Sequence, residues 1–138
     1  MKIKEKSKSR KILFLDTSKD ETLIAVFDDR KLLEIISWNG NGELSDTLLA
    51  KIELLFRKNH LKLGDISLIA INLGPGSYTG LRIGISTVNA ISWSNKIPIR
   101  SAKYENNKLA FLSTETLKSV LPLYAYPPNI TKKKKINV

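Results

Sequence analysis

Two short stretches carry residue types that could contact a phosphate or a metal-bound water. The first, Asp16-Thr17-Ser18, ends an apolar run of strand length. The second is the loop Gly74–Gly80, which lies between another apolar run and a helical pattern. A carboxylate at a strand end can hold a hydrated cation, and a glycine-rich turn before a helix can present amide N–H groups to an anion. The candidate phosphate contacts are Asp16, Thr17, Ser77 and Thr79.

Each of these stretches also has a purely structural interpretation. Asp16 can cap the turn into a hairpin, and Ser77 or Thr79 can cap the helix that follows the loop. The loop does not fit the P-loop, because no Gly-Lys-Ser or Gly-Lys-Thr stands at the required spacing. It also departs from the dinucleotide motif Gly-x-Gly-x-x-Gly, because Thr79 occupies the place of the last glycine. A phosphate site and a plain strand-to-helix turn therefore both stay open.

No convincing set of catalytic residues is present. The chain has no cysteine and a single histidine, His60, which excludes thiolate sites and histidine-pair metal sites. A solvated residue at the polar end of a helix is the simpler interpretation of His60. Arg82 could meet an anion or a partner's carboxylate, or it could simply be exposed. We predict no catalytic residue, no metal site and no cofactor.

Apolar patterns predict a five-stranded mixed sheet. The expected strands are residues 12–15, 22–27, 31–38, 66–73 and a stretch that starts at Ile97-Pro98-Ile99. Short turns join the first three, which predicts an antiparallel meander. A helix joins the last two, which predicts a parallel pair with a right-handed crossover.

Two main helices should accompany the sheet. The first begins at Leu44 and closes at Asn59-His60, with a wide apolar stripe formed by Leu44, Leu48, Leu49, Ile52, Leu55 and Phe56. The second covers about residues 79–94. A short helix over residues 113–120 and a return segment at residues 121–124 complete the expected elements.

The second helix is apolar on two sides. One face carries Leu81, Ile85 and Val88, and the other carries Ile83, Ala90 and Trp93. A helix of this kind is normally buried on both sides. One side can cover the sheet, so the other needs a neighbouring helix or another molecule. Packing of the two helices on each other explains the pattern equally well.

Length and charge bound the class of protein. A chain of 138 residues predicts one domain with a real core. The net charge of +10 lies mostly in residues 1–11 and in Lys132–Lys135, so the part between them is nearly neutral. Such basic ends are typically solvated, although they could attract RNA weakly. Without a cysteine, a membrane-length apolar run or a secretory signal, the expected location is the cytoplasm, with no membrane partner.

The order of elements, with Asp16-Thr17-Ser18 ending the first strand, resembles the first lobe of the actin, Hsp70 and sugar kinase superfamily (the ASKHA fold, ribonuclease H-like). More narrowly, Leu15-Asp16-Thr17-Ser18 and the stretch Gly-Pro-Gly-Ser-Tyr-Thr-Gly-Leu-Arg-Ile-Gly over residues 74–84 resemble the bacterial TsaB (YeaZ) family. The likeness covers residues 11 to 100.

The resemblance implies a non-catalytic scaffold that binds a TsaD-type transferase in making N6-threonylcarbamoyladenosine on tRNA. In that family the two helices pack against equivalent TsaD helices, a TsaE-type ATPase joins the assembly, and tRNA is reached indirectly. We expect no enzyme activity from the chain itself. The metal-binding histidine pair of TsaD has no counterpart here.

Two departures from the family bear on the domain plan. The stretch Glu43-Leu44-Ser45-Asp46 replaces a His-Ser-Glu-like helix start, so no role of that histidine transfers. The family normally continues into a second lobe, which we expect to be largely deleted between about residues 101 and 112. The predicted organisation is a basic flexible arm at 1–10, a single lobe at 11–124 and a basic tail at 125–138. A nucleotide would then lack the second wall of its cleft.

The expected partner interface lies on the two main helices. Its residues are Leu48, Ile52, Leu55, Ile83, Ala90 and Trp93. One alternative is a small nucleotide- or phosphate-binding enzyme that uses Asp16 and the Gly74–Gly80 loop. Another is a homodimer through the same helices.

Overall fold

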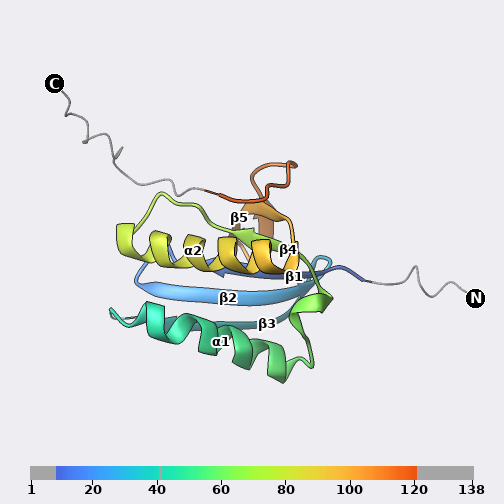
Figure 1. Cartoon of the computed structure of the whole chain (residues 1–138), viewed down its shortest axis with the longest axis horizontal. Coiled ribbons are helices and arrows are strands. Elements are labelled where there is room, and N and C mark those ends of the chain that lie inside the picture. Colours follow the sequence, from blue (N-terminus) through green and yellow to red (C-terminus); the bar gives the residue numbers. More distant parts are fainter. Residues whose placement is uncertain (1–8, 41, 121–138) are drawn as a thin grey trace, which may run out of the picture.

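The computed structural model describes residues 9–40 and 42–120, in which two long helices lie over one face of a mixed sheet (Figure 1). The strands are β1 (Lys11–Asp16), β2 (Glu21–Asp28), β3 (Lys31–Asn39), β4 (Ile66–Ile71), β5 (Ile99–Glu105) and β6 (Lys108–Phe111). The helices are α1 (Leu44–Lys58) and α2 (Tyr78–Asn95), and a 3-10 turn η2 (Leu63–Asp65) precedes β4. Neither long helix is apolar enough over sufficient length to cross a bilayer.

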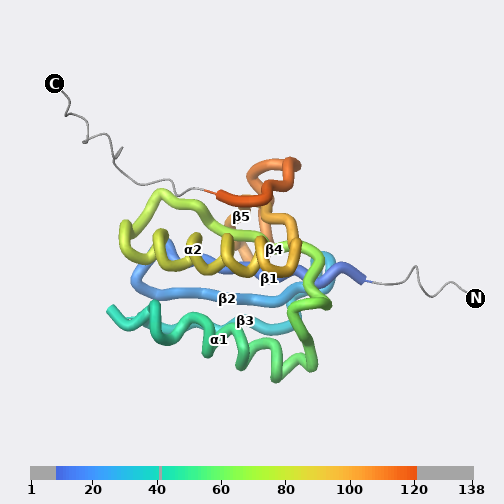
Figure 2. The backbone as a smooth tube through the Cα atoms, viewed as in Figure 1, coloured from blue at the N-terminus to red at the C-terminus, as the bar shows by residue number. Residues whose placement is uncertain are grey.

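The sheet has the strand order β3-β2-β1-β4-β5-β6. β1 is antiparallel to β2 and parallel to β4, and β4 is parallel to β5. The antiparallel meander and the parallel crossover are therefore confirmed. This path, which Figure 2 traces, brings the ends of β1 and β4 together at one edge, because parallel neighbours end at the same side.

The sheet has six strands, so the prediction of five was wrong. The missed strand, β6, forms a hairpin with β5. Its turn residues Asn106 and Asn107 both have positive φ, 52° and 62°. A two-residue hairpin turn of type I′ needs positive φ at both positions, which asparagine tolerates. The Asn-Asn pair was the signal that could have revealed this strand.

The predicted helix over residues 113–120 was also wrong. Leu117 instead forms an isolated antiparallel bridge with Ile99 at the start of β5. The side chain of Asn89 on α2 also donates to the carbonyl of Val120 and accepts its N–H, at 3.0 and 2.9 Å. In this extended segment the backbone N–H and C=O groups of Leu117 and Val120 bond to β5 and to Asn89. In a helix the same groups would bond within the helix, and these contacts would be lost. The return segment at residues 121–124 and most of both basic ends lie outside the described residues.

Alternating side chains divide the core between the two faces of the sheet. Leu13 and Leu15 face the helices, whereas Ile12 and Phe14 face the other side, as strand geometry requires. The predicted inner residues of α2, Leu81, Ile85 and Val88, are buried against the first face. On the second face Tyr104 of β5 packs against Phe14 and Phe27, with ring centroids 6.4 and 6.1 Å apart.

Candidate functional site

A polar network joins the carboxyl ends of β1 and β4. Asp16 Oδ1 accepts hydrogen bonds from the Ser18 amide at 2.9 Å and the Ser18 hydroxyl at 2.6 Å. Asn72 donates its side-chain amide to Asp16 Oδ2 at 3.1 Å and accepts from the Gly74 N–H at 2.9 Å. Asp16 therefore acts as a turn anchor in this structure. Sequence reasoning missed Asn72, although a polar residue at the end of an apolar strand was a usable signal.

The glycines of the loop allow it to lie directly on the Asp16-Thr17-Ser18 turn. A Cβ at Gly76 would overlap the Ser18 carbonyl, and one at Gly80 would overlap the Thr17 carbonyl. A Cβ at Gly84 would overlap the Thr17 side chain. Because residues four apart share one helix face, Gly80 and Gly84 form a flat strip on the first turns of α2. The long motif is thus explained by close packing within the chain.

The predicted phosphate contacts are mostly engaged within the chain. Ser77 is the N-cap of α2: its hydroxyl accepts from the Gly80 N–H at 3.2 Å, and its own N–H donates to the Ser18 carbonyl at 2.8 Å. Thr17 is fully buried, and its hydroxyl has no hydrogen-bond partner among the residues described. Ser77 and Thr79 are exposed, whereas Asp16 is half-buried. The geometry gives the phosphate interpretation no support, and it stays a prediction.

A shallow hollow of about 240 Å³ beside the loop holds Lys19 and Asp20 at its rim, with Thr79 and Gly80 on its wall. His60 lies exposed, with φ 56°, just beyond the C-terminus of α1. In the described part of the chain no three histidine or acidic side chains gather as a metal site would require.

Helix α1 places three of the expected interface residues in the chain's own core. Leu48, Ile52 and Leu55 are buried against the sheet, so a partner cannot reach them in this conformation. The stripe is wide because α1 lies close to β3, where Trp38 Nε1 donates to Thr47 Oγ1 at 3.2 Å. Leu49 is the one residue of the predicted apolar stripe that is strongly exposed, with 55% of its surface accessible.

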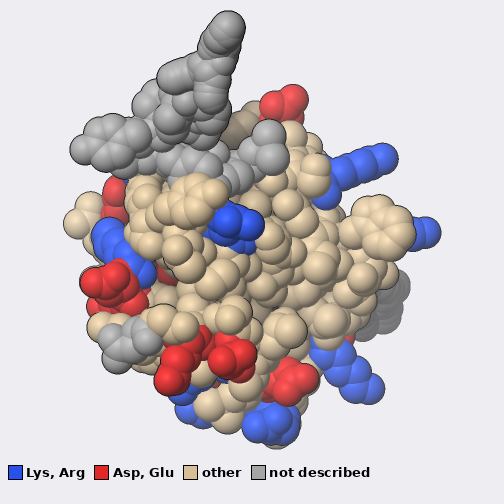
Figure 3. Space-filling model, turned by 60° about the vertical axis from the view of Figure 1, so that its left-hand side comes forward, with Lys and Arg blue, Asp and Glu red and all other residues tan. Residues whose placement is uncertain are grey.

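Helix α2 keeps the other expected interface residues at the surface. Trp93 is 82% exposed, Ala90 is exposed, and Ile83 is half-buried. Ala90 also lines a groove of about 480 Å³ between the two helices, whose lining includes Leu49, Leu63, Ser86, Thr87 and Ile91. Charged side chains lie mainly around the margin of the face that Figure 3 shows, and its centre carries few of them. We call Leu49, Ile83, Ala90, Trp93 and this groove the helix face.

Comparison with known proteins gives consistent results. The TsaB protein of Buchnera aphidicola (subspecies Schizaphis graminum), described as a tRNA threonylcarbamoyladenosine biosynthesis protein, is 35% identical over 88 residues. These cover 64% of this chain and 41% of that protein. The TsaB protein of Bacillus subtilis is 34% identical over 89 residues, or 64% of this chain and 38% of that protein. Over the matched residues the chain is homologous to the TsaB (YeaZ) family.

A family model described as TsaD, tRNA N6-adenosine threonylcarbamoyltransferase, also matches residues 42–102, which include both helices of the helix face. Among solved structures, YeaZ from Pseudomonas aeruginosa superposes with a TM-score of 0.63 at 17% identity, over 79% of this chain and 68% of that one. The chain therefore has the ASKHA-like lobe of this family. It matches less than half the length of either TsaB relative.

Proposed function

We propose that this chain is a non-catalytic scaffold that binds a TsaD-type transferase through its helix face, in N6-threonylcarbamoyladenosine modification of tRNA. The observation that carries the proposal is the exposure of Trp93, at 82%, on the same helix as the half-buried Ile83 and the exposed Ala90. An aromatic ring left in water contributes nothing to the core, whereas tryptophan is a frequent anchor of protein interfaces. Exposed apolar side chains of this kind are typical of a partner surface.

Kinship with both families supports the choice of partner. The segment that matches the TsaD model contains both α1 and α2, and the TsaB relative of Buchnera aphidicola matches 64% of the chain. Two lobes of one fold can pair through equivalent surfaces about a pseudo-two-fold axis. A stable pair of this kind would bury on the order of 1,600 Å² in total.

The geometry of the Asp16 network supports a role without catalysis. The N–H groups of Gly74, Ser77 and Gly80 donate within the chain, so they are not free to hold a phosphate. No observation favours the nucleotide-dependent enzyme. Participation of a TsaE-type ATPase rests on the family resemblance and stays a proposal.

Co-elution with the organism's TsaD-type protein tests the proposal. Truncation of a central anchor costs about 2 kcal/mol or more, so Trp93→Ala should weaken binding at least about 30-fold. Ala90→Glu places a charge on the helix face and should abolish the complex, while circular dichroism stays that of the folded parent. Unchanged co-elution of both variants would reject the assignment.

The matched control is Ala110→Glu, which adds the same charge at another exposed alanine, on the edge strand β6. It should leave co-elution intact. Light scattering of the chain alone tests the homodimer alternative, because self-association through the helix face would be lost in the Ala90→Glu variant.

A further inference from the structure

A second surface lies near the start of β1, on the sheet face away from the helices. It is an open hollow of about 990 Å³ whose lining includes Arg10, Arg30, Arg100, Lys108, Leu109 and Phe111. We call it the basic groove. Its cations come from the segment before β1, the β2–β3 turn, β5 and β6. Strands far apart in the sequence thus bring four positive side chains to one place.

The basic groove is separate from both features described above. Ile12, Leu109 and Phe111 belong to or pack on the core cluster that contains no helix residue. Arg10 precedes β1, whereas the Asp16 network lies at the other end of that strand. A ligand in the groove would therefore leave the helix face free.

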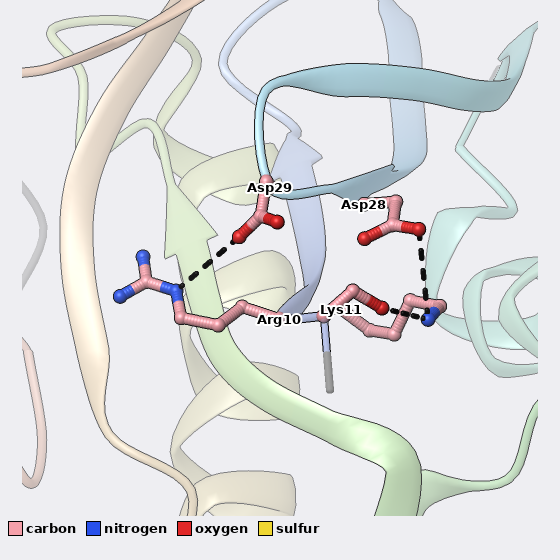
Figure 4. A network of polar contacts seen from close by, with 5 residues as sticks. Arg10, Lys11, Asp28 and Asp29 are labelled. Atoms are coloured by element: carbon pink, nitrogen blue, oxygen red, sulfur yellow. Dashed lines mark hydrogen bonds and ion pairs between the residues drawn. The ribbon is translucent and has the colours of Figure 1, made fainter. Parts of the chain in front are cut away.

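Most of the positive charge in the groove has no carboxylate partner. Asp29 lies 3.9 Å from Arg10 Nε, and both side chains are largely exposed (Figure 4). The neighbouring Lys11 is engaged elsewhere, with Asp28 at 3.8 Å. Within residues 9–40 and 42–120, the other three cations of the groove form no ion pair. The groove thus carries an excess of positive charge that an anionic ligand would neutralise.

Arg100 gives the groove a flat aromatic ledge. Its guanidinium lies over the Phe111 ring, 4.1 Å from the centroid, and its Nε–H donates to the Ser113 carbonyl at 3.1 Å. These contacts hold the guanidinium plane in place. Planar groups of this kind stack on bases, while neighbouring cations bind phosphates.

We propose that the basic groove binds RNA, with Arg10, Arg30 and Lys108 on the sugar–phosphate backbone and the Arg100–Phe111 ledge against an unpaired base. The choice of RNA among polyanions rests on the proposed role in tRNA modification. The combination of unpaired cations with a stacking ledge favours a nucleic acid over an acidic peptide, which needs no such ledge. Four further lysines precede Arg10 in the sequence, within residues 1–8.

The test measures binding of fluorescently labelled tRNA to the full chain alone, by anisotropy across a salt series. Arg30→Gln with Lys108→Gln removes two exposed charges that form no described ion pair. Loss of two phosphate contacts should lower the slope of log affinity against log salt by about two. We expect binding at low salt to weaken by about tenfold or more.

The matched control is Arg57→Gln with Lys62→Gln, which removes the same charge at exposed positions at the end of α1 and just beyond it. It should leave the salt slope unchanged. An equal loss of tRNA affinity in both double variants would show a general effect of net charge and would overturn the proposal. An unchanged salt slope in the Arg30→Gln, Lys108→Gln variant would also overturn it.

A second variant tests the ledge. Arg100→Lys keeps the charge but removes the planar guanidinium, so binding of a single-stranded RNA oligonucleotide should weaken while the salt slope stays the same. An unaltered affinity would reject the stacking role. Because no transferase is present in these assays, their failure would leave the heterodimer proposal standing, and failure of the co-elution test would leave the RNA result standing.

Discussion

At Gly84 there is no room for a methyl group, because the Thr17 side chain lies against this turn of α2. Gly76 and Gly80 meet the backbone of Ser18 and Thr17 in the same way. These three glycines therefore allow α2 and the loop before it to approach the residues that follow β1 closely. Their role is packing, although the same residues could be mistaken for a phosphate loop in the sequence.

Gly84→Ala tests this role. Alanine has the better helix propensity, by up to about 1 kcal/mol, but an overpacked core site costs about 1–3 kcal/mol. We expect a lower free energy of unfolding in urea. Gly64→Ala is the control, because nothing lies within 4 Å of its added Cβ. Thr17→Ala should restore part of the loss in the double variant, and a stabilised Gly84→Ala protein would contradict the explanation.

A polar contact at the end of α1 fastens the helix to the edge strand β3. Glu34 of β3 accepts from Lys58 Nζ at 2.6 Å and from Asn59 Nδ2 at 2.9 Å. The hydrogen bond from Lys58, helped by that from Asn59 and by the lysine charge, holds the pKa of Glu34 below its ordinary value despite an opposing effect of burial. Folding therefore favours the ionised carboxylate.

The pH dependence of stability follows from the lowering of the Glu34 pKa by folding. A group whose pKa is lowered by folding stabilises the protein above its unfolded pKa, and this contribution is lost as pH falls through the folded value. The difference in unfolding free energy between the parent and Glu34→Gln should be present at neutral pH and shrink in acid. In a Lys58→Gln background the pH dependence of that difference should be weaker. A difference that grew on acidification would contradict the assignment.

Across the whole molecule the sheet separates two surfaces of different chemistry. The helix face is apolar and carries Trp93, whereas the basic groove lies on the other side with Arg100 and Phe111. A protein partner and an RNA strand could therefore be held at the same time. This arrangement would suit a subunit that assists a transferase without doing the chemistry.

The two surfaces should respond independently to mutation. Substitutions at well-separated sites usually have additive effects. Ala90→Glu should therefore keep the tRNA affinity of the parent, and the Arg30→Gln, Lys108→Gln double variant should keep co-elution with the TsaD-type protein. Anisotropy and gel filtration on the same preparations measure both. Loss of both activities in either variant would show that the surfaces are coupled or that the variant is misfolded.

The sequence by itself determined the meander, the crossover and both long helices, because apolar periodicity is a local property of the chain. The same local pattern could not say which side of a helix the sheet would cover. Only the tertiary structure placed Leu48, Ile52 and Leu55 in the core and left Trp93 in water. The short strand β6 was decided by its pairing with β5, a contact between strands.

Among the polar sites, too, local features could be predicted from the sequence, whereas contacts between distant residues could not. The Ser77 cap was among the choices read from the sequence, since a cap acts within a few residues. The link from Asn72 to Asp16 spans distant positions and depended on β1 and β4 lying side by side. The cations of the basic groove come from separate strands and turns, so their convergence was decided by strand order alone.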